Sequence, residues 1–352
     1  MATSPYDSDL SGLSSVSPFR EPIAPSLTPV ELRWEAASSN LLSILVDAFG
    51  KQGVFLAASG TSMTEISYCR MTDADRDVDL FIKIIPKRLA RGVQRSDGIS
   101  NYVNSCGLLT PVCMPGFPKA CIDGRVTFAY PFVEGIYLNS SQGELQALGG
   151  ALARLHTALA SFPDAHKIAR RQREMRTRMR DKAKELLVDQ RWASGDLSPI
   201  RTHLQRWLEV DAILGKDGCQ VIHNDLNAGN VLQDTKGDVW FLDFEEARWS
   251  YLPPNFDVAK VIERFILVNE DWDKQTKITA SQRFLCEYRG ARDDVRGMAG
   301  GIPPALRWQL GFSWLRMSGL LFEREAIQHP EVRKFLHLAE LLDKNEAWLT
   351  KL

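Results

Sequence analysis

The chain has 352 residues, 44% of them hydrophobic and 25% charged, which is enough apolar material for one large core or two smaller ones. Its formal net charge of -1 at pH 7 gives no global electrostatic reason to bind nucleic acid or an anionic membrane, and we expect neither partner. The six cysteines form no C-x-x-C pair and no apolar run reaches about eighteen residues, which together predict a soluble protein of the reducing cytoplasm.

The N-terminal 27 residues are rich in Ser and Pro and poor in large apolar groups, and no signal peptide is visible, so residues 1–27 are predicted to be disordered. Thr28, Pro29 and Glu31 then match a capping threonine, a proline at the first helical position and a capping-box glutamate. They predict a helix that ends near Phe49.

An antiparallel sheet is predicted next. Short β-rich runs separated by polar turns cover residues 54–57, 65–70 and 78–85. A helix near residues 96–106 and strands punctuated by proline, around 112–114 and 126–133, complete a first lobe of residues 28–133.

The remaining residues, 134–352, are predicted to form a mainly helical second lobe. Residues 144–159 repeat apolar side chains every three or four positions. The charged run over 165–187 also holds acidic residues, which favours a solvated helix face over a nucleic-acid patch. One hairpin, centred on Gly237, interrupts the helices. The fold class is therefore α+β with two lobes, an antiparallel sheet lobe followed by a helical lobe.

The most informative motif is the H-x-D-x-x-x-x-N spacing of His223, Asp225 and Asn230, which phosphoryl-transfer kinases use on their catalytic loop. Asp225 is predicted to accept or orient the proton of an attacking hydroxyl, as a general base. Asn230 is predicted to hold a divalent metal through its carbonyl oxygen, and His223 to be a structural anchor.

Asp243 follows Asn230 by thirteen residues, within the run Phe-Leu-Asp-Phe-Glu at the end of the predicted hairpin. Magnesium prefers a few protein oxygens together with phosphate oxygens and water. One carboxylate and one amide beside bound ATP would supply them, so Asp243 and Asn230 are the predicted Mg²⁺ ligands.

Lys83 lies in the apolar strand of residues 80–85, where a charged group needs an anionic partner to offset its desolvation. ATP phosphates would be that partner, whereas a solvent-exposed lysine on an edge strand is the common alternative. Ser59, Gly60 and Thr61, between the first two strands, would either cover the phosphates with backbone N–H groups or form a plain hairpin turn.

A single match to the loop motif is common by chance. The order of Lys83, Asp225, Asn230 and Asp243, with the loop preceded by helices and flanked by apolar strands, is much less common. Together these residues predict magnesium- and ATP-dependent transfer of a phosphoryl group to a hydroxyl.

Over about residues 56–320 the sequence resembles the aminoglycoside phosphotransferase and choline/ethanolamine kinase superfamily. The matching segments are His-Asn-Asp-Leu from His223, Leu-Asp-Phe-Glu from Leu242, and the helical run that ends at His156. The resemblance implies a protein-kinase-like fold and places Tyr130 and Phe132 on the hinge whose backbone groups bind adenine. Asp257, at the start of a helix after the metal strand, also fits.

In choline kinases the acid after the metal aspartate and nearby aromatic rings surround a quaternary ammonium. By this resemblance the substrate candidates are Glu245, Trp249, Tyr251 and Trp314, with ordinary helix packing as the alternative for each ring. Two departures imply an acceptor other than choline. The insertion containing Pro253 and Pro254 lengthens the path to Asp257, and Met317 stands where the choline pattern has a second tryptophan.

The superfamily also places a glutamate on the first-lobe helix to pair with the strand lysine, and here only Asp97 stands at about the right distance. Its side chain is one methylene shorter. Either the helix sits closer to Lys83, or this ion pair is absent and phosphate alone orients the lysine.

Two other functions were weighed against a kinase for an amino alcohol, aminoglycoside or sugar. A protein kinase shares the phosphate chemistry, but Asp243-Phe244-Glu245 replaces D-F-G, and neither A-P-E nor a G-x-G-x-x-G before Lys83 is present. A non-catalytic nucleotide-binding scaffold would not need the base Asp225. The oligomeric state is not indicated by the sequence.

Overall fold

The computed structural model describes residues 34–36, 38–49, 55–58, 67–73, 78–120, 124–138, 141–189, 198–214, 218–292, 301–319, 321 and 329–352. The segment predicted to be disordered and the proposed phosphate-covering residues Ser59, Gly60 and Thr61 lie outside these ranges. The chain divides into two compact units. The first contains the described residues up to Tyr137 together with Gly229–Arg248, and the second contains those of Leu138–Ala228 and Trp249–Leu352.

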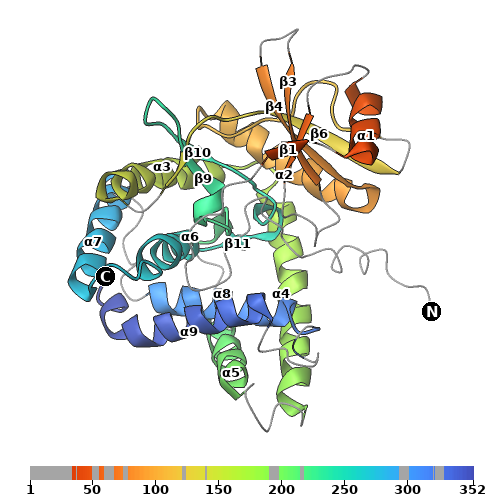
Figure 1. Ribbon diagram of the computed structural model, residues 1–352. Coiled ribbons are helices and arrows are strands. Elements are labelled where there is room, and N and C mark those ends of the chain that lie inside the picture. The colour runs from red at the N-terminus through yellow and green to blue at the C-terminus, as the bar shows by residue number, and fades with distance from the viewer. Residues whose placement is uncertain are drawn as a thin grey trace. The chain divides into compact units, whose positions relative to one another are not determined.

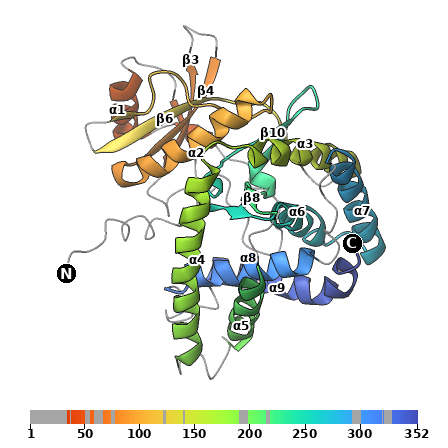
Figure 2. The same cartoon turned by 180° about the vertical axis from the view of Figure 1, so that it is seen from behind.

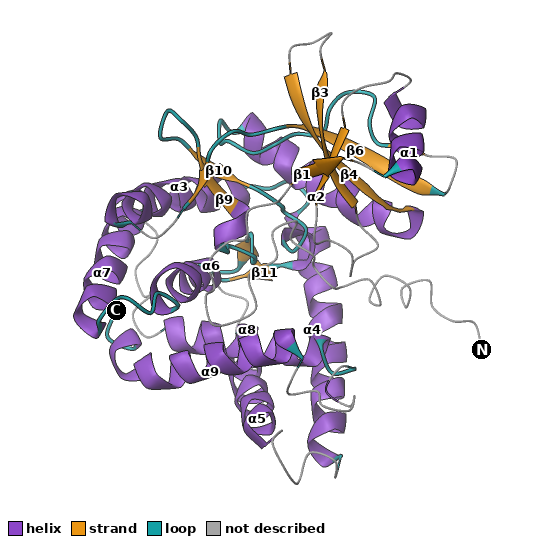
Figure 3. Ribbon diagram, in the orientation of Figure 1, coloured by secondary structure: helices purple, strands orange, loops and turns teal. Residues whose placement is uncertain are grey.

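The first unit is built on an antiparallel sheet, in which the described strands follow the order β1-β2-β3-β4-β6-β5 (Figures 1 and 3). Their bounds are β1 Trp34–Ala36, β2 Phe55–Ala58, β3 Ser67–Asp73, β4 Val78–Pro86, β5 Lys119–Ala120 and β6 Arg125–Pro131. The strands expected at 54–57, 65–70, 78–85 and 126–133 are thereby confirmed. The strand expected at 112–114 is wrong, because flanking prolines remove amide donors and one bond, Met114 N–H to the Ala129 carbonyl at 2.8 Å, attaches the segment.

The two helices of this unit begin elsewhere than expected. The N-terminal helix α1 is Ser39–Phe49, not a helix from residue 28, because residues 34–36 pair with β2 as a strand. The capping pattern around Thr28 was a local signal, and sheet pairing overrides it at these residues. Helix α2 is Lys87–Ser105 and starts directly after β4, nine residues before the expected 96.

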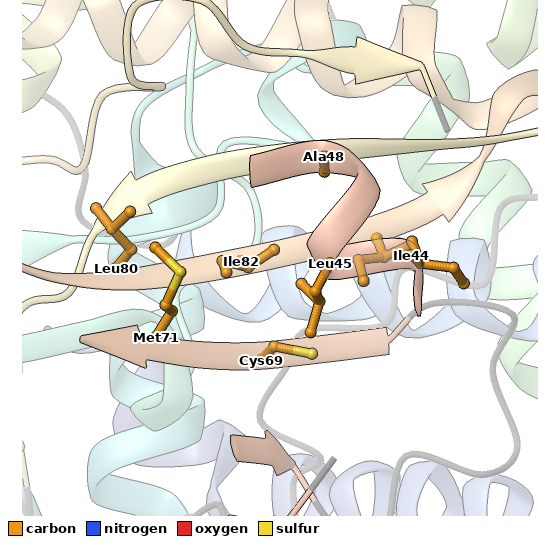
Figure 4. Packing of buried hydrophobic residues seen from close by; sticks show 8 residues of the cluster. Ile44, Leu45, Ala48, Cys69, Met71, Leu80 and Ile82 are labelled. Carbon is orange, nitrogen blue, oxygen red and sulfur yellow. The ribbon is translucent and has the colours of Figure 1, made fainter. Parts of the chain in front are cut away.

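Opposite faces of this sheet carry α1 and α2, because successive side chains of a strand point to opposite sides. Leu80, Ile82 and Ile84 of β4 pack with the α1 residues Ile44, Leu45 and Ala48 and with Cys69 and Met71 of β3 (Figure 4). Ile85 packs on the other side, with Val93 of α2 and Phe128 of β6. Lys83, two residues before Ile85, therefore points to the α2 face.

A small second sheet in the same unit has the order β10-β9-β7, formed by β7 Ile136–Tyr137, β9 Val231–Gln233 and β10 Val239–Phe241. The predicted hairpin is confirmed, with Gly237 in its turn at a φ of 86° that favours glycine.

The second unit is mainly helical, as predicted. Its α-helices are α3 Gln142–Ala160, α4 Ala165–Val188, α5 Ser198–Ile213, α6 Asn255–Val261, α7 Lys274–Gly290, α8 Ile302–Arg316 and α9 Pro330–Leu349. A π-helix, η5 Ile262–Leu267, continues α6, and β8 Gln220–Val221 pairs with β11 Tyr251–Leu252. A capping box of Ser141 and Glu144 starts α3, which packs along α7 (Figure 2). Within the described part of the chain, no helix combines the length and apolar character of a membrane span.

Gly311 sets the close approach of α8 to α5. A Cβ atom at this position would lie 2.4 Å from the Cβ and 2.6 Å from the Cγ of Trp207, whose side chain is completely buried. We predict that Gly311→Ala lowers the free energy of unfolding by about 1–3 kcal/mol through overpacking, measured by urea denaturation. Gly290→Ala in α7 is the matched control, since its Cβ would meet nothing within 4 Å. Equal stability of the two variants would contradict the prediction.

Candidate functional site

A cavity in the first unit lies on the α2 face of the sheet and contains Lys83. Its walls come from β3, β4, α2, the segment after β6 and the β9–β10 hairpin. The polar and charged side chains that line it are Tyr68, Lys83, Ser96, Asp97, Ser100, Thr110, Tyr130, Tyr137, Asp243 and Glu245. All of these residues belong to the first unit, so the cavity is a property of that unit alone.

The β9–β10 hairpin brings the two predicted metal ligands to one end. Val231 is paired with Phe241, and the next backbone bond joins Leu242 N–H to the Asn230 carbonyl at 2.9 Å. Asn230 and Asp243 therefore leave the hairpin at the same end, one on each strand. Asn230 is completely buried and Asp243 lines the cavity, so an amide and a carboxylate, both oxygen ligand types of Mg²⁺, lie at this end.

Asp243 has a backbone φ of 56°, in the left-handed region that non-glycine residues seldom adopt. Its Oδ1 accepts a hydrogen bond from the backbone N–H of Glu245 at 3.3 Å. Such conformations cost free energy and are concentrated at functional sites. The local geometry therefore fits a carboxylate held for metal binding. The described residues contain no cluster of three or more His, Cys, Asp or Glu side chains that could hold a metal by themselves.

Lys83 forms an ion pair with Glu245, and both side chains are largely buried. Burial lowers the pKa of Lys83, but Glu245 and Asp243 outweigh this effect and hold it above its ordinary value. Burial likewise opposes ionisation of Glu245, whereas Lys83 lowers the pKa of this carboxyl. Both groups are charged, and because β4 lies between β3 and β6, the alternative of an exposed edge-strand lysine is wrong.

This pair bears on two expectations about acids near Lys83. Glu245 was expected beside the substrate, and its carboxylate contacts Lys83. The sequence left open whether Asp97 of α2 pairs with Lys83, and its Oδ1 instead accepts a hydrogen bond from the Tyr130 hydroxyl at 2.9 Å. A sequence signal for the Lys83–Glu245 contact was absent, since 162 positions separate the two residues.

The predicted hinge segment presents one amide to the cavity. Pro131 has no N–H, and the N–H of Phe132 donates to the Asp79 carbonyl at 2.8 Å. Arg70 covers the Phe132 ring, with its guanidinium carbon 4.1 Å from the ring centroid. The next residue, Val133, lines the cavity, and its N–H has no partner among the described residues. Val133 is therefore the residue of this segment that lines the cavity and whose backbone donor is not used by the described residues.

The loop that carries Asp225 is anchored within the second unit by Asp257. The buried Asp257 carboxylate accepts the backbone N–H groups of His223 at 2.8 Å and Asn224 at 2.6 Å. Asn224 has a φ of 63°, so the loop takes a left-handed turn just before the predicted base. Asn227 Nδ2 donates to Asp225 Oδ1 at 3.3 Å, which orients the carboxylate. His223 is completely buried, consistent with an anchoring role.

A buried histidine supports this anchor. His156 Nε2 lies 3.0 Å from Asp257 Oδ2, and its Nδ1 lies 2.6 Å from the Tyr288 hydroxyl. Because the carboxylate only accepts, Nε2 carries the proton and Nδ1 accepts from tyrosine. The backbone carbonyl of His156 also accepts from Gln220 Nε2 at 2.7 Å. His156 was placed by resemblance, whereas no local pattern indicated Tyr288 or Gln220.

The aromatic substrate candidates differ in burial. Trp314 is completely buried, with its ring centroid 5.8 Å from that of Phe335, so its predicted substrate contact is contradicted by core packing. Trp249 is 9% exposed. Tyr251 is half-buried on β11, which leaves it the more accessible of the two.

The anchoring role of the Asp257 carboxylate can be tested by replacing one of its oxygens with an NH₂ group. In Asp257→Asn the side-chain NH₂ group cannot accept a hydrogen bond, so at least one buried loop N–H loses its partner. We predict a fall of about 1–3 kcal/mol in the free energy of unfolding, measured by urea denaturation. Asp271→Asn, at an exposed position, is the control and should leave the midpoint unchanged. An unchanged midpoint for Asp257→Asn would refute the anchor.

Asp97 predicts a pH dependence. Burial raises the pKa of Asp97 to about 6, although the Tyr130 hydrogen bond and the charge of Lys83 oppose this effect and Glu245 adds to it. The native state then binds the proton more tightly than the unfolded chain, so wild-type stability falls as pH rises from about 4 through about 6. Asp97→Asn mimics the protonated form and can still accept from Tyr130. We predict that it gains on the order of 1–2 kcal/mol over wild type at pH 8, and less at pH 4.5. Urea denaturation at both pH values checks this, and a difference independent of pH would contradict it.

Comparisons with known proteins identify the family and the fold of the chain. The model of the phosphotransferase enzyme family matches residues 65–298. No curated protein sequence matches the chain. Among solved structures, a spectinomycin phosphotransferase in complex with ADP and spectinomycin has 13% identity and a TM-score of 0.54, over 90% of this chain and 99% of that one.

Two further solved structures are similar. An aminoglycoside phosphotransferase variant in a ternary complex with ADP and hygromycin B has 11% identity and a TM-score of 0.58, over 88% of this chain and 99% of that one. Another structure, a GDP and kanamycin complex, has 13% identity and a TM-score of 0.59, with the same two coverages. At these identities the likeness concerns the fold, and it confirms the predicted α+β, protein-kinase-like class.

Proposed function

The chain belongs to the phosphotransferase enzyme family, and we propose that it transfers the γ-phosphoryl group of ATP to a hydroxyl of a small molecule. The observation that carries this proposal is that Lys83 and Asp243 line one cavity of the first unit, with Asn230 at the same end of the hairpin as Asp243. Phosphoryl transfer depends mainly on positioning and charge neutralisation, and these groups supply both.

Different parts of the cavity suit the base and the phosphates of a nucleotide. The Val133 N–H can bind the base at the hinge, and Lys83 offers a buried ammonium to the phosphates. Apolar side chains of the hairpin, among them Leu232 and Leu242, line the space between them. The ADP and GDP complexes of the similar structures support a purine nucleotide as donor.

Asn230 and Asp243 are the residues that would hold Mg²⁺. Bound there, the ion would neutralise charge on the phosphate oxygens during transfer. The fit rests on the shared hairpin end and on the left-handed backbone of Asp243.

Asp225 is the proposed general base. As the hydroxyl oxygen of the acceptor attacks the γ-phosphorus, its proton passes to the Asp225 carboxylate and the bond to the β–γ bridging oxygen breaks, releasing ADP. Asn227 orients this carboxylate, and Asp257 fixes the backbone on its N-terminal side. Asn230 follows Asp225 by five residues in the same loop, so one segment supplies both the base and a metal ligand.

We assign the acceptor to hydroxyl compounds such as amino alcohols, aminoglycosides or sugars, which the antibiotic complexes of the similar structures support as a class. A cytoplasmic location without nucleic-acid or membrane partners remains a proposal, resting on the near-zero net charge and the cysteine pattern.

The test is turnover of ATP and GTP against a panel of hydroxyl compounds. We predict that Asp225→Asn lowers the rate of phosphoryl transfer by a factor of roughly 10² to 10⁴ while nucleotide binding is retained, because the base acts only in the chemical step.

Asp243→Asn should instead weaken Mg²⁺-dependent nucleotide binding, measured by titration calorimetry. Transfer by Asp225→Asn at the wild-type rate, or no binding of either Mg²⁺-nucleotide by wild type, would refute the proposal. Labelling of proteins without labelling of small molecules would identify a protein kinase instead.

A further inference from the structure

The residue that holds Lys83 lies in the metal-binding segment, not on α2. Glu245 follows Asp243 by two positions and forms the ion pair with Lys83. The Glu245 backbone N–H donates to Asp243 Oδ1 at 3.3 Å. One residue therefore orients both groups: its amide holds the proposed metal carboxylate, and its side chain holds the proposed phosphate-binding ammonium.

Helix α2 contributes to the site without supplying this acid. The α2 carboxylate that lines the cavity, Asp97, accepts from Tyr130, and its contacts in the described residues include no ion pair with Lys83. The helix instead meets the metal-binding segment at Gly92. A Cβ atom at this position would lie 1.6 Å from Nη1 of Arg248, so the absence of a side chain admits the guanidinium. The segment from Asp243 to Arg248 thus contacts both β4 and α2.

The burial of Lys83 explains why the carboxylate of Glu245 matters to the site. An ammonium as buried as that of Lys83 needs a close anion, and loss of one member of a buried pair leaves the other charge uncompensated. The left-handed backbone of Asp243 and the hydrogen bond from the Glu245 amide to the Asp243 carboxylate belong to the same turn. Movement of Glu245 would therefore disturb the lysine and the metal carboxylate together.

We propose that Glu245 is a positioning residue that orients Lys83 for the nucleotide phosphates and couples this lysine to the metal carboxylate Asp243. The inference rests on the proposed function, because it concerns how the same site holds a Mg²⁺-nucleotide. It differs from the expectation that Glu245 contacts the acceptor.

Glu245→Gln tests the coupling, with Mg²⁺ titration of nucleotide binding and separate KM values for nucleotide and acceptor as readouts. We expect the Mg²⁺ concentration for half-maximal binding and the nucleotide KM to rise roughly 10- to 100-fold, as when groups around a metal ligand are removed. The acceptor KM should stay unchanged. In the double variant with Lys83→Met, the loss should not exceed that of Lys83→Met alone, because the two residues act through one contact.

Two further variants sharpen the result. Glu270→Gln, at a carboxylate whose side chain is 61% exposed and does not line the cavity, is the matched acid-to-amide control and should behave as wild type. Glu245→Asp keeps the charge on a shorter side chain and should raise the nucleotide KM less than Glu245→Gln does. It also keeps the test open if Glu245→Gln fails to fold, which thermal unfolding would reveal.

Three outcomes would overturn the inference. Tighter nucleotide binding by Glu245→Gln would show that Glu245 competes with phosphate for Lys83. A change confined to the acceptor KM would show that Glu245 contacts the acceptor substrate instead. If Asp97→Asn raised the Mg²⁺ requirement and the Glu245 variants did not, the acid that positions Lys83 would be Asp97 of α2. In each of these three outcomes the wild-type protein still binds nucleotide. If the wild-type protein bound no nucleotide, the proposed function would be refuted as well.

Discussion

The burial of one ammonium group, that of Lys83, is the constraint on which the candidate site depends. Lys83 stands on a central strand, on the face that turns toward α2, where its side chain is largely removed from water. The compensating anion comes from Glu245, far along the chain, so folding of the sheet and placement of the β9–β10 hairpin are tied to each other. This pair keeps a charged ammonium in the cavity wall and holds the segment after β10 beside β4.

Backbone strain appears at two positions of the proposed machinery, and each has a local compensation. Asn224 and Asp243 are the non-glycine residues with positive φ in the described chain, and they lie beside the predicted base and at the predicted metal ligand. Asp257 accepts the N–H of Asn224, while Asp243 accepts the N–H of Glu245. Carboxylates thus hold both turns, as strained backbone persists only where its surroundings fix it. In both segments, a hydrogen bond to a carboxylate therefore stabilises the turn that contains the residue with positive φ.

Sequence reasoning succeeded where a local pattern determines the structure. A β-rich run between polar turns located β4, and the turn chemistry at Gly237 located the hairpin that joins Asn230 to Asp243. It failed where tertiary contacts decide. A good capping pattern at Thr28 was followed by a strand at residues 34–36, because pairing with β2 determines their conformation. The partner of Lys83 was likewise unpredictable, since nothing in the sequence ranks Glu245 above Asp97 as an anion for that strand.

The same contacts narrow the acceptor. A quaternary ammonium needs a carboxylate and several accessible aromatic faces around it. Here the Glu245 carboxylate is engaged by Lys83, and Trp314 is completely buried against Phe335. Methionine already stands at position 317, where the choline pattern has tryptophan. Of the original candidates only Trp249 and Tyr251 remain, and Trp249 is 9% exposed. Among the proposed acceptors, a quaternary amino alcohol recognised through ring faces is therefore the least supported, which favours acceptors bound through hydrogen bonds to their hydroxyl and amino groups.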